Sequence, residues 1–179
     1  MDAVRPTVCP CCGCAGQPVG ARLGIVGHGL RERQQRGPTV AGGAPRLIVI
    51  RARRYACQCG AILTVVPRET LPGRLYTISA VAWALALFGV DGVSLCEVRH
   101  RTSPWAIVGA TAIAGWATLR RWVAAVRARR LLPDVRPCPV DFTARQVAAR
   151  AATTISALAR PDFGAPIAAR AFVGAARAA

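Results

Sequence analysis

Apolar residues in the first 67 positions come in three short runs that favour β-strands. The runs cover residues 23–33, 46–55 and 61–66, and β-branched residues are frequent in the second and third. Glycine and proline separate the first two runs, and Pro67 follows the third. Short apolar runs bounded by such turn residues are typical of strands. The pattern therefore predicts a three-stranded β module.

The apolar pattern takes a helical period after residue 76. Ile78, Val81, Leu85 and Phe88 recur at a spacing of three to four residues, and Gly89 follows them. This spacing places the four side chains on one face of a helix. We therefore predict a helix that begins near Ile78 and ends at Gly89.

Two further helix starts follow. Ser94 and Glu97 have the spacing of a capping box, in which the hydroxyl and the carboxylate bind free backbone amides. Ser103-Pro104 is a second start signal, since proline needs no amide partner in the first helical turn. Gly115 interrupts that short helix, and residues 116–130 are predicted to form another one.

The composition changes again beyond residue 132. Prolines at positions 133, 137 and 139 indicate a linker, and residues 141–159 could form one more amphipathic helix. Residues 161–179 consist mainly of alanine, glycine, proline and arginine. We expect this end of the chain to be frayed or disordered.

The cysteines of the first third form two clusters with metal-ligand spacing. Cys9 and Cys12 belong to a Cys-Pro-Cys-Cys-Gly sequence, and Cys57 and Cys59 to Cys-Gln-Cys-Gly. Two such turns can place four thiolates around one tetrahedral zinc ion. A module of this size buries little apolar area, so metal binding would supply much of its stability. The sequence therefore predicts a structural zinc site.

Other ligand sets stay open at this stage. Cys11 and Cys14 form a second Cys-x-x-Cys pair, and His28 lies in a Gly-His-Gly turn, where it could instead contact phosphate. Free thiols in loops are the simplest alternative. No helix is predicted directly after Cys12 to lower its pKa, so a redox role is not favoured. Cys96 falls in an apolar helix and is expected in the core.

The charge balance points to a polyanionic partner. The chain of 179 residues carries 24 basic residues, all of them arginine, against 8 acidic ones, and its net charge is +16. Clustered cations gain free energy by releasing counterions from nucleic-acid phosphates. Arg51, Arg53 and Arg54 in the second predicted strand are candidates for phosphate contacts, which position a protein without specifying a sequence.

Two of the predicted helices suggest a helix-turn-helix unit. In this interpretation the helix from Ser94 crosses the DNA backbone, and the helix over residues 116–130 enters the major groove. Its DNA-binding candidates are Thr118, Arg120, Arg121 and Arg127. The alternative is an ordinary helical bundle whose arginines only solvate the outer face.

The sequence does not contain the residue patterns that are typical of a catalytic site. No pair of carboxylates, Ser-His or Cys-His arrangement, or glycine-rich phosphate loop stands out. We therefore expect no enzymatic activity and no small-molecule substrate.

Two apolar stretches, residues 76–90 and 105–119, raise the question of a membrane hairpin. Both are shorter than the roughly 20 residues that a spanning helix needs. No apolar signal segment follows Met1. We expect a cytoplasmic protein, where reduced cysteines favour metal binding over disulfides, and membrane association is the least favoured alternative.

The order of these motifs resembles the N-terminal region of insertion-sequence transposases. The resemblance covers about residues 5–130 and is carried by Cys9–Gly13, Arg53–Cys57, Pro67, Ser94–Val98 and Thr118–Trp122. It implies a zinc ribbon followed by a helix-turn-helix that binds terminal inverted repeats. This chain departs from the family's pattern in the insertion at residues 103–115 and in lacking the family's catalytic domain. The resemblance thus implies DNA recognition without strand transfer.

We therefore predict an α+β protein with three segments. Residues 1–70 form a three-stranded zinc ribbon, residues 71–131 a helical helix-turn-helix-like domain, and residues 132–179 a linker with one helix and a flexible tail. The predicted function is sequence-specific binding of double-stranded DNA, as a homodimer with structural zinc. The alternative is a zinc-stabilised module that binds protein through its apolar helices.

Overall fold

The computed structural model describes residues 4–105, 115–160 and 164–178. The chain divides into two compact units. The first comprises Met1–Gln34 and Val49–Pro67, and the second comprises Gln35–Ile48 and Arg68–Ala179. The tip of the first hairpin thus belongs to the second unit.

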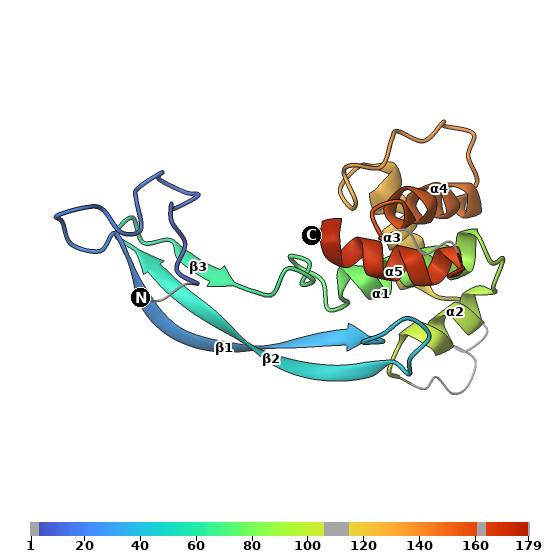
Figure 1. The fold of residues 1–179 in the computed structure, drawn as a ribbon, viewed down its shortest axis with the longest axis horizontal. Coiled ribbons are helices and arrows are strands. Elements are labelled where there is room, and N and C mark those ends of the chain that lie inside the picture. The colour runs from blue at the N-terminus through green and yellow to red at the C-terminus, as the bar shows by residue number, and fades with distance from the viewer. Residues whose placement is uncertain (1–3, 106–114, 161–163, 179) are drawn as a thin grey trace. The chain divides into compact units, whose positions relative to one another are not determined.

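Three strands form one antiparallel sheet in the order β1-β2-β3 (Figure 1). They are β1 (Ile25–Gly37), β2 (Arg46–Cys57) and β3 (Ile62–Val65). Tyr55 of β2 lies opposite Leu63 of β3, which fixes the register of this pair. The three predicted strands are confirmed, although β1 runs four residues beyond the predicted end at residue 33.

The first unit has a very small core. The cluster of buried residues at its centre consists of Cys9, Ile25, Tyr55 and Cys57, and Leu63 is among the partly buried side chains that pack against them. Two of these four buried residues are cysteines, so the chemistry of the thiols is part of the core itself. Such a core is too small to secure a fold by apolar burial alone.

Within the residues that the structure describes, the second unit contains five helices (Figure 1). They are α1 (Ile78–Gly89), α2 (Leu95–Thr102), α3 (Ala117–Arg127), α4 (Ala144–Ser156) and α5 (Ile167–Ala178). The main packing is among α1, α4 and α5, which all contact one another. The coarse α+β class predicted from the sequence is confirmed.

The predicted first helix is the central helix of this unit. All residues of α1 except Trp83 and Gly89 are buried, and the Thr77 side chain caps its start by accepting a hydrogen bond from the Ala80 amide at 3.1 Å. Small side chains let the neighbouring helices approach closely. A Cβ placed on Gly89 would lie 2.2 Å from the Ala149 amide nitrogen, so α4 packs directly on the α1 backbone.

The C-terminal segment differs from its prediction. Residues 132–179 belong to the same compact unit as residues 68–131, and α5 replaces the expected flexible tail. Ala168, Ala171 and Ala175 on α5 are buried in the core of this unit. The helix is amphipathic, but apart from Phe172 its buried side chains are alanines, and alanine does not by itself distinguish a packed helix from a disordered tail.

The helix α3 is held by an aromatic cluster. Trp116 and Trp122 are buried and meet the Tyr76 ring edge-to-face at centroid distances of 5.7 and 5.1 Å. Trp105 is half exposed. The helix predicted from Ser103 falls mostly on residues 106–114, outside the described part of the chain. Among the described residues, no helix has the length and apolarity that crossing a bilayer requires.

Candidate metal centre and basic surfaces

Two tight turns carry the cysteines of the first unit. In the first, the Gly13 amide donates to the Cys9 carbonyl at 2.9 Å, and in the second the Gly60 amide donates to the Cys57 carbonyl at 2.9 Å. Both glycines have positive φ, 73° and 87°, which side chains other than glycine rarely adopt. The Cys-x-x-Cys-Gly and Cys-x-Cys-Gly sequences therefore fold into the two turns that their glycines predicted.

The turns bring cysteine sulfurs from both clusters together. The sulfurs of Cys9, Cys12, Cys14 and Cys57 all lie within 4.8 Å of one another. Cys59 is close as well, with its sulfur 3.9 Å from that of Cys9. Three of the four predicted ligands thus lie in the compact group, Cys14 joins them, and Cys59 lies at its edge. His28 is exposed on β1 and is not part of the group.

The protein environment separates the thiols into two classes. The backbone amide of Cys14, followed by contacts with the Cys14, Cys59 and Cys57 thiols, lowers the pKa of Cys12 to about 6. The amides of Cys12 and then of Cys11 also lower the pKa of Cys9. A thiolate is therefore favoured in the first turn before any metal binds.

The cysteines of the second turn hold their protons more firmly. The Cys59 amide lowers the pKa of Cys57, but the contact with the Cys14 thiol and the burial of the group outweigh it, and the pKa rises. At Cys59 the Ala61 amide and the Cys57 thiol lower the pKa, yet contacts with other thiols and burial again raise it overall. A metal that uses these sulfurs must displace their protons.

If the sulfur group binds zinc, as the sequence predicts, its affinity for zinc should rise with pH. Below a raised pKa the thiol keeps its proton, so zinc competes with protons at the second turn, whereas Cys12 needs none removed above about pH 6. Displacing two or more protons strengthens binding by about a hundredfold or more per pH unit. Competition with a chelator between pH 6.5 and 8 measures this slope, and a change below tenfold per unit would contradict the assignment.

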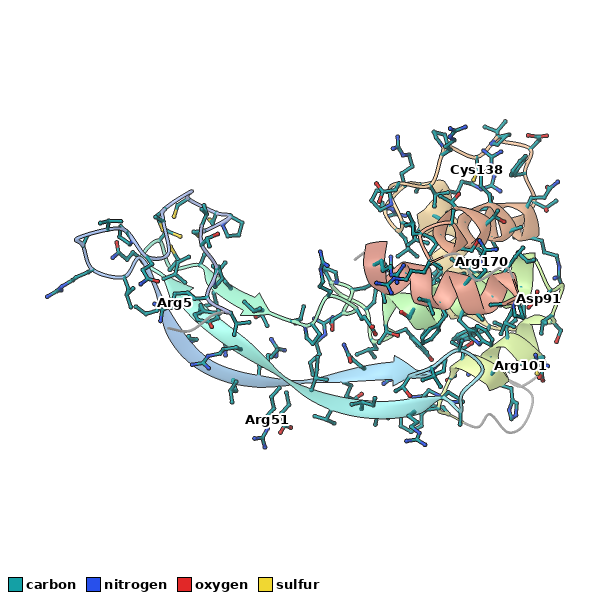
Figure 2. The ribbon with its side chains drawn as sticks, in the orientation of Figure 1. Arg5, Arg51, Asp91, Arg101, Cys138 and Arg170 are labelled. Carbon is teal, nitrogen blue, oxygen red and sulfur yellow. The ribbon has the colours of Figure 1, made fainter. Side chains whose placement is uncertain are left out.

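The arginines predicted to contact DNA from the sheet differ in their surroundings. Arg51 points away from the β1–β2 hairpin into solvent, with its nearest carboxylate, Glu32, at 3.9 Å (Figure 2). Arg53 is exposed, and it already interacts with another group of the protein. Arg54 is half-buried. An exposed ion pair as long as the one of Arg51 contributes little, so that guanidinium remains available to a phosphate.

The two helices expected to form a helix-turn-helix do not pack chiefly on each other. Within the described residues, α2 packs mainly on α1, and α3 packs mainly on α4. A helix-turn-helix motif pairs its two helices across a short turn, whereas residues 103–116 separate these. The predicted helix-turn-helix is not confirmed.

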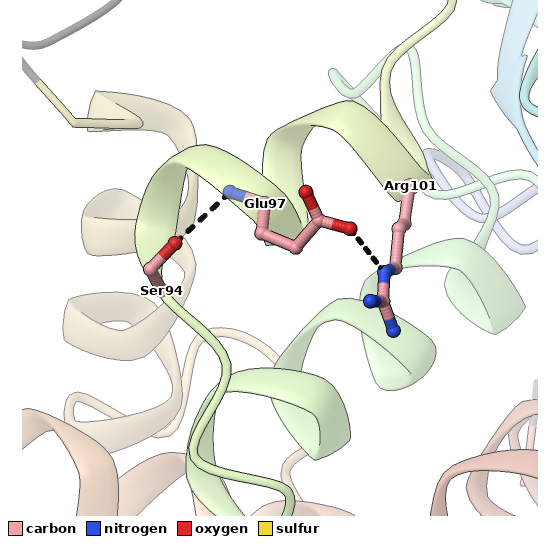
Figure 3. A network of polar contacts seen from close by, with 3 residues as sticks. All are labelled: Ser94, Glu97 and Arg101. Carbon is pink, nitrogen blue, oxygen red and sulfur yellow. Dashed lines mark hydrogen bonds and ion pairs between the residues drawn. The ribbon is translucent and has the colours of Figure 1, made fainter.

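The start of α2 forms one of the two hydrogen bonds that a capping box predicts (Figure 3). The Ser94 hydroxyl accepts a hydrogen bond from the Glu97 amide at 3.2 Å, as a capping residue should. The Glu97 carboxylate, however, accepts a hydrogen bond from Arg101 Nε at 2.6 Å one turn along. The reciprocal half of the capping box is replaced by this ion pair. Cys96, expected in the core, is exposed on the same helix.

On α3 the predicted DNA contacts separate into two groups. Arg120 and Arg121 are exposed, and Thr118 is half-buried beside them. Arg127 instead binds the loop before α4, donating to the Val140 carbonyl at 3.0 Å and to the Phe142 carbonyl. The structure thus gives Arg127 an intramolecular role that the helical pattern did not indicate.

Several other arginines have the same intramolecular role. Arg145 donates to the Phe88 carbonyl at 2.6 Å, and its guanidinium lies 4.5 Å from the centroid of the Phe88 ring. Arg150 donates to the Pro137 carbonyl at 2.8 Å and packs over the Phe142 ring. The planar guanidinium can bind a carbonyl and an aromatic ring together. Part of the high arginine content therefore stabilises loops and helix ends.

Comparison of the chain with protein-family models, with curated proteins and with solved structures finds no match.

Proposed function

We propose that this chain is a zinc-stabilised protein that binds double-stranded DNA. The observation that carries the proposal is the group of four cysteine sulfurs within 4.8 Å, drawn from two turns 43 or more residues apart. Four thiolates are the donor set of structural zinc, which takes tetrahedral sulfur ligands. In this proposal the first unit is a zinc ribbon, and its metal replaces the large core that the unit lacks.

The sulfur separations bear on which cysteines bind the ion. Zn–S bonds of about 2.3 Å in a tetrahedron place neighbouring sulfurs about 3.8 Å apart. The Cys12–Cys57 and Cys9–Cys59 distances, 3.6 and 3.9 Å, are close to this value. The Cys14–Cys57 distance of 3.2 Å is shorter. Cys9, Cys12 and Cys57 are therefore three ligands of the proposed site, and the candidates for the fourth are Cys14, which belongs to the compact group, and Cys59, which lies at its edge.

Serine variants distinguish the two candidates for the fourth ligand. If Cys59 is a ligand, Cys59→Ser loses zinc and Cys14→Ser keeps it. Zinc retained in Cys59→Ser and lost in Cys14→Ser would assign the position to Cys14.

The DNA-binding part of the proposal rests on charge and exposure. The chain carries a net charge of +16, and Arg51, Arg120 and Arg121 present exposed guanidinium groups. Each phosphate contact releases counterions, so the affinity should fall steeply as salt increases. The resemblance to insertion-sequence transposases supports the same function. Inverted repeats flanking the coding sequence would support an origin in such an element.

Replacing Arg120 and Arg121 together by alanine is expected to abolish sequence preference and to weaken DNA binding by about tenfold or more. Their side chains lie on the exposed side of α3, so the fold should be unaffected. Gel shifts with specific and random duplexes measure both effects. The matched control is Arg136→Ala with Arg160→Ala, an equal charge change at exposed positions elsewhere. Equal behaviour of the two double variants would contradict the assignment.

A protein-binding module is the second candidate. The sequence suggested apolar helices as the protein-binding surface. The helix α1, however, is almost wholly buried and offers no such surface. Exposed aliphatic side chains occur instead on the strands, with Leu30 59% and Val49 54% exposed. An affinity for a protein partner that does not change with salt concentration would favour this candidate over DNA binding.

A further inference from the structure

The second unit contains a cavity that the metal centre and the DNA surfaces do not use. It has a volume of about 400 Å³ and lies between the segment before α1 and the segment after α3. Its walls include Arg68, Arg74, Arg130, Leu131, Leu132 and Ile155. Pockets of about 300–1,000 Å³ are the usual size of small-molecule sites.

The lining joins an apolar base to a cationic rim. Leu131, Leu132 and Ile155 are at most 5% exposed and belong to the core of the unit. Arg68 and Arg130 are the exposed arginines of the lining, and we call them its rim. The one acidic residue of the lining is Asp134, so three arginines and one aspartate leave a net charge of two positive units. Such a cavity favours a ligand with an apolar body and an anionic group.

Two guanidinium groups are available for that anionic group. Within the described part of the chain, neither Arg68 nor Arg130 makes an ion pair or a side-chain hydrogen bond. Arg74, which is half-buried, has an interaction of its own. Arginine forms paired hydrogen bonds with phosphate or carboxylate oxygens. The rim can therefore receive an anion without breaking an existing ion pair of Arg68 or Arg130.

The backbone holds one wall of the cavity in a fixed conformation. The Arg129 amide donates to the Val126 carbonyl at 2.9 Å and the Arg130 amide to the Ala125 carbonyl at 2.8 Å, the pattern of a Schellman helix end. Arg129 has φ of 56° in this motif, and Leu132 has φ of 53°. Residues other than glycine are strained at such positive φ values, and residues with this backbone conformation cluster at ligand sites. The hydrogen bonds keep Arg130 and Leu131 beside the cavity.

We propose that this cavity binds a small organic anion, with its phosphate or carboxylate group between Arg68 and Arg130 and its apolar part against Leu131, Leu132 and Ile155. The ligand is small because the volume admits a single ring or short chain. Tight binding needs both the anionic group and the apolar part of the ligand. Inorganic phosphate would leave the apolar base empty, and an uncharged alcohol would leave the guanidinium groups of Arg68 and Arg130 without an anion.

Calorimetric titration of phenyl phosphate into the full zinc-loaded chain tests the proposal. We expect saturable binding of one equivalent, with inorganic phosphate and benzyl alcohol each at least tenfold weaker. Arg130→Gln should weaken phenyl phosphate binding by about tenfold, because a charge-assisted hydrogen bond is lost. Arg160→Gln removes the same charge from an exposed position outside the cavity and should have no effect.

Three outcomes would overturn the proposal. They are no binding of phenyl phosphate, inorganic phosphate binding as tightly as phenyl phosphate, and equal weakening by Arg130→Gln and Arg160→Gln. Arg68→Gln is a second variant at the rim, and circular dichroism confirms that each variant keeps its helices. Phenyl phosphate affinity unchanged in both Arg68→Gln and Arg130→Gln would also contradict the assigned anion position.

Discussion

Replacing Cys57 by serine is expected to abolish zinc binding and to unfold the sheet unit while the helical unit stays folded. Burying an aliphatic side chain such as Ile25 contributes about 1.5–3 kcal/mol. Among the described residues, the buried cluster of this core consists of Cys9, Ile25, Tyr55 and Cys57. Structural zinc contributes about 10–16 kcal/mol in small zinc-binding domains. If the proposed centre holds zinc, metal binding is the largest single contribution to this unit, and losing it should cost the unit its fold.

Amide hydrogen exchange measures this effect region by region. In Cys57→Ser the amides of β2 and β3 around Tyr55 and Leu63 should lose protection, and those of α1 should keep it. The control is Cys96→Ser, since Cys96 is an exposed thiol on α2 outside the sulfur group. Wild-type protection of the sheet amides in Cys57→Ser would show that the unit does not depend on the metal.

Placing alanine at Gly89 is expected to destabilise the helical unit by about 1–3 kcal/mol, the usual cost of overpacking. Alanine normally favours a helix over glycine by about 1 kcal/mol. At Gly89, however, the new Cβ would lie 2.2 Å from the Ala149 amide nitrogen and 2.7 Å from the Ala148 carbonyl carbon. Backbone atoms cannot rotate away as a side chain can, so α4 must shift and the steric cost exceeds the helix preference.

Urea unfolding followed by the helical circular dichroism signal gives this free energy. Gly174→Ala should show a similar loss, because its Cβ would lie 2.1 Å from the Ile155 carbonyl oxygen. Gly27→Ala is the control, since no atom lies within 4 Å of its Cβ position and its φ is not positive. Stability equal to or above wild type in both helical variants would contradict the close packing of α1, α4 and α5.

Periodicity predicted the elements well wherever large apolar side chains carried it. Ile78, Val81, Leu85 and Phe88 located α1, and the prolines and glycines between strands separated β1, β2 and β3. These features are local, so the sequence alone determines them. The prediction for the α5 segment was wrong because its buried side chains, apart from Phe172, are alanines and its packing partners are distant in sequence.

The candidate site shows the same division between local and distant contacts. Glycines after Cys12 and Cys59 predicted the two turns, and both turns form. The proximity of Cys14 to Cys57, 43 residues away, depends on how the turns meet and has no local signal beyond its Cys-x-x-Cys spacing with Cys11. Likewise, the bond between Arg127 and the Val140 carbonyl depends on a loop that the helical pattern of α3 does not specify.

The most direct test of the account is X-ray absorption at the zinc edge of the purified chain. The account predicts one zinc per chain with four sulfur neighbours at about 2.3 Å and no lighter ligand. Cys57→Ser should lose this signal and Cys96→Ser should retain it. A chain that purifies without zinc, or a zinc shell containing nitrogen or oxygen ligands at about 2.0–2.1 Å, would contradict the proposed four-thiolate centre.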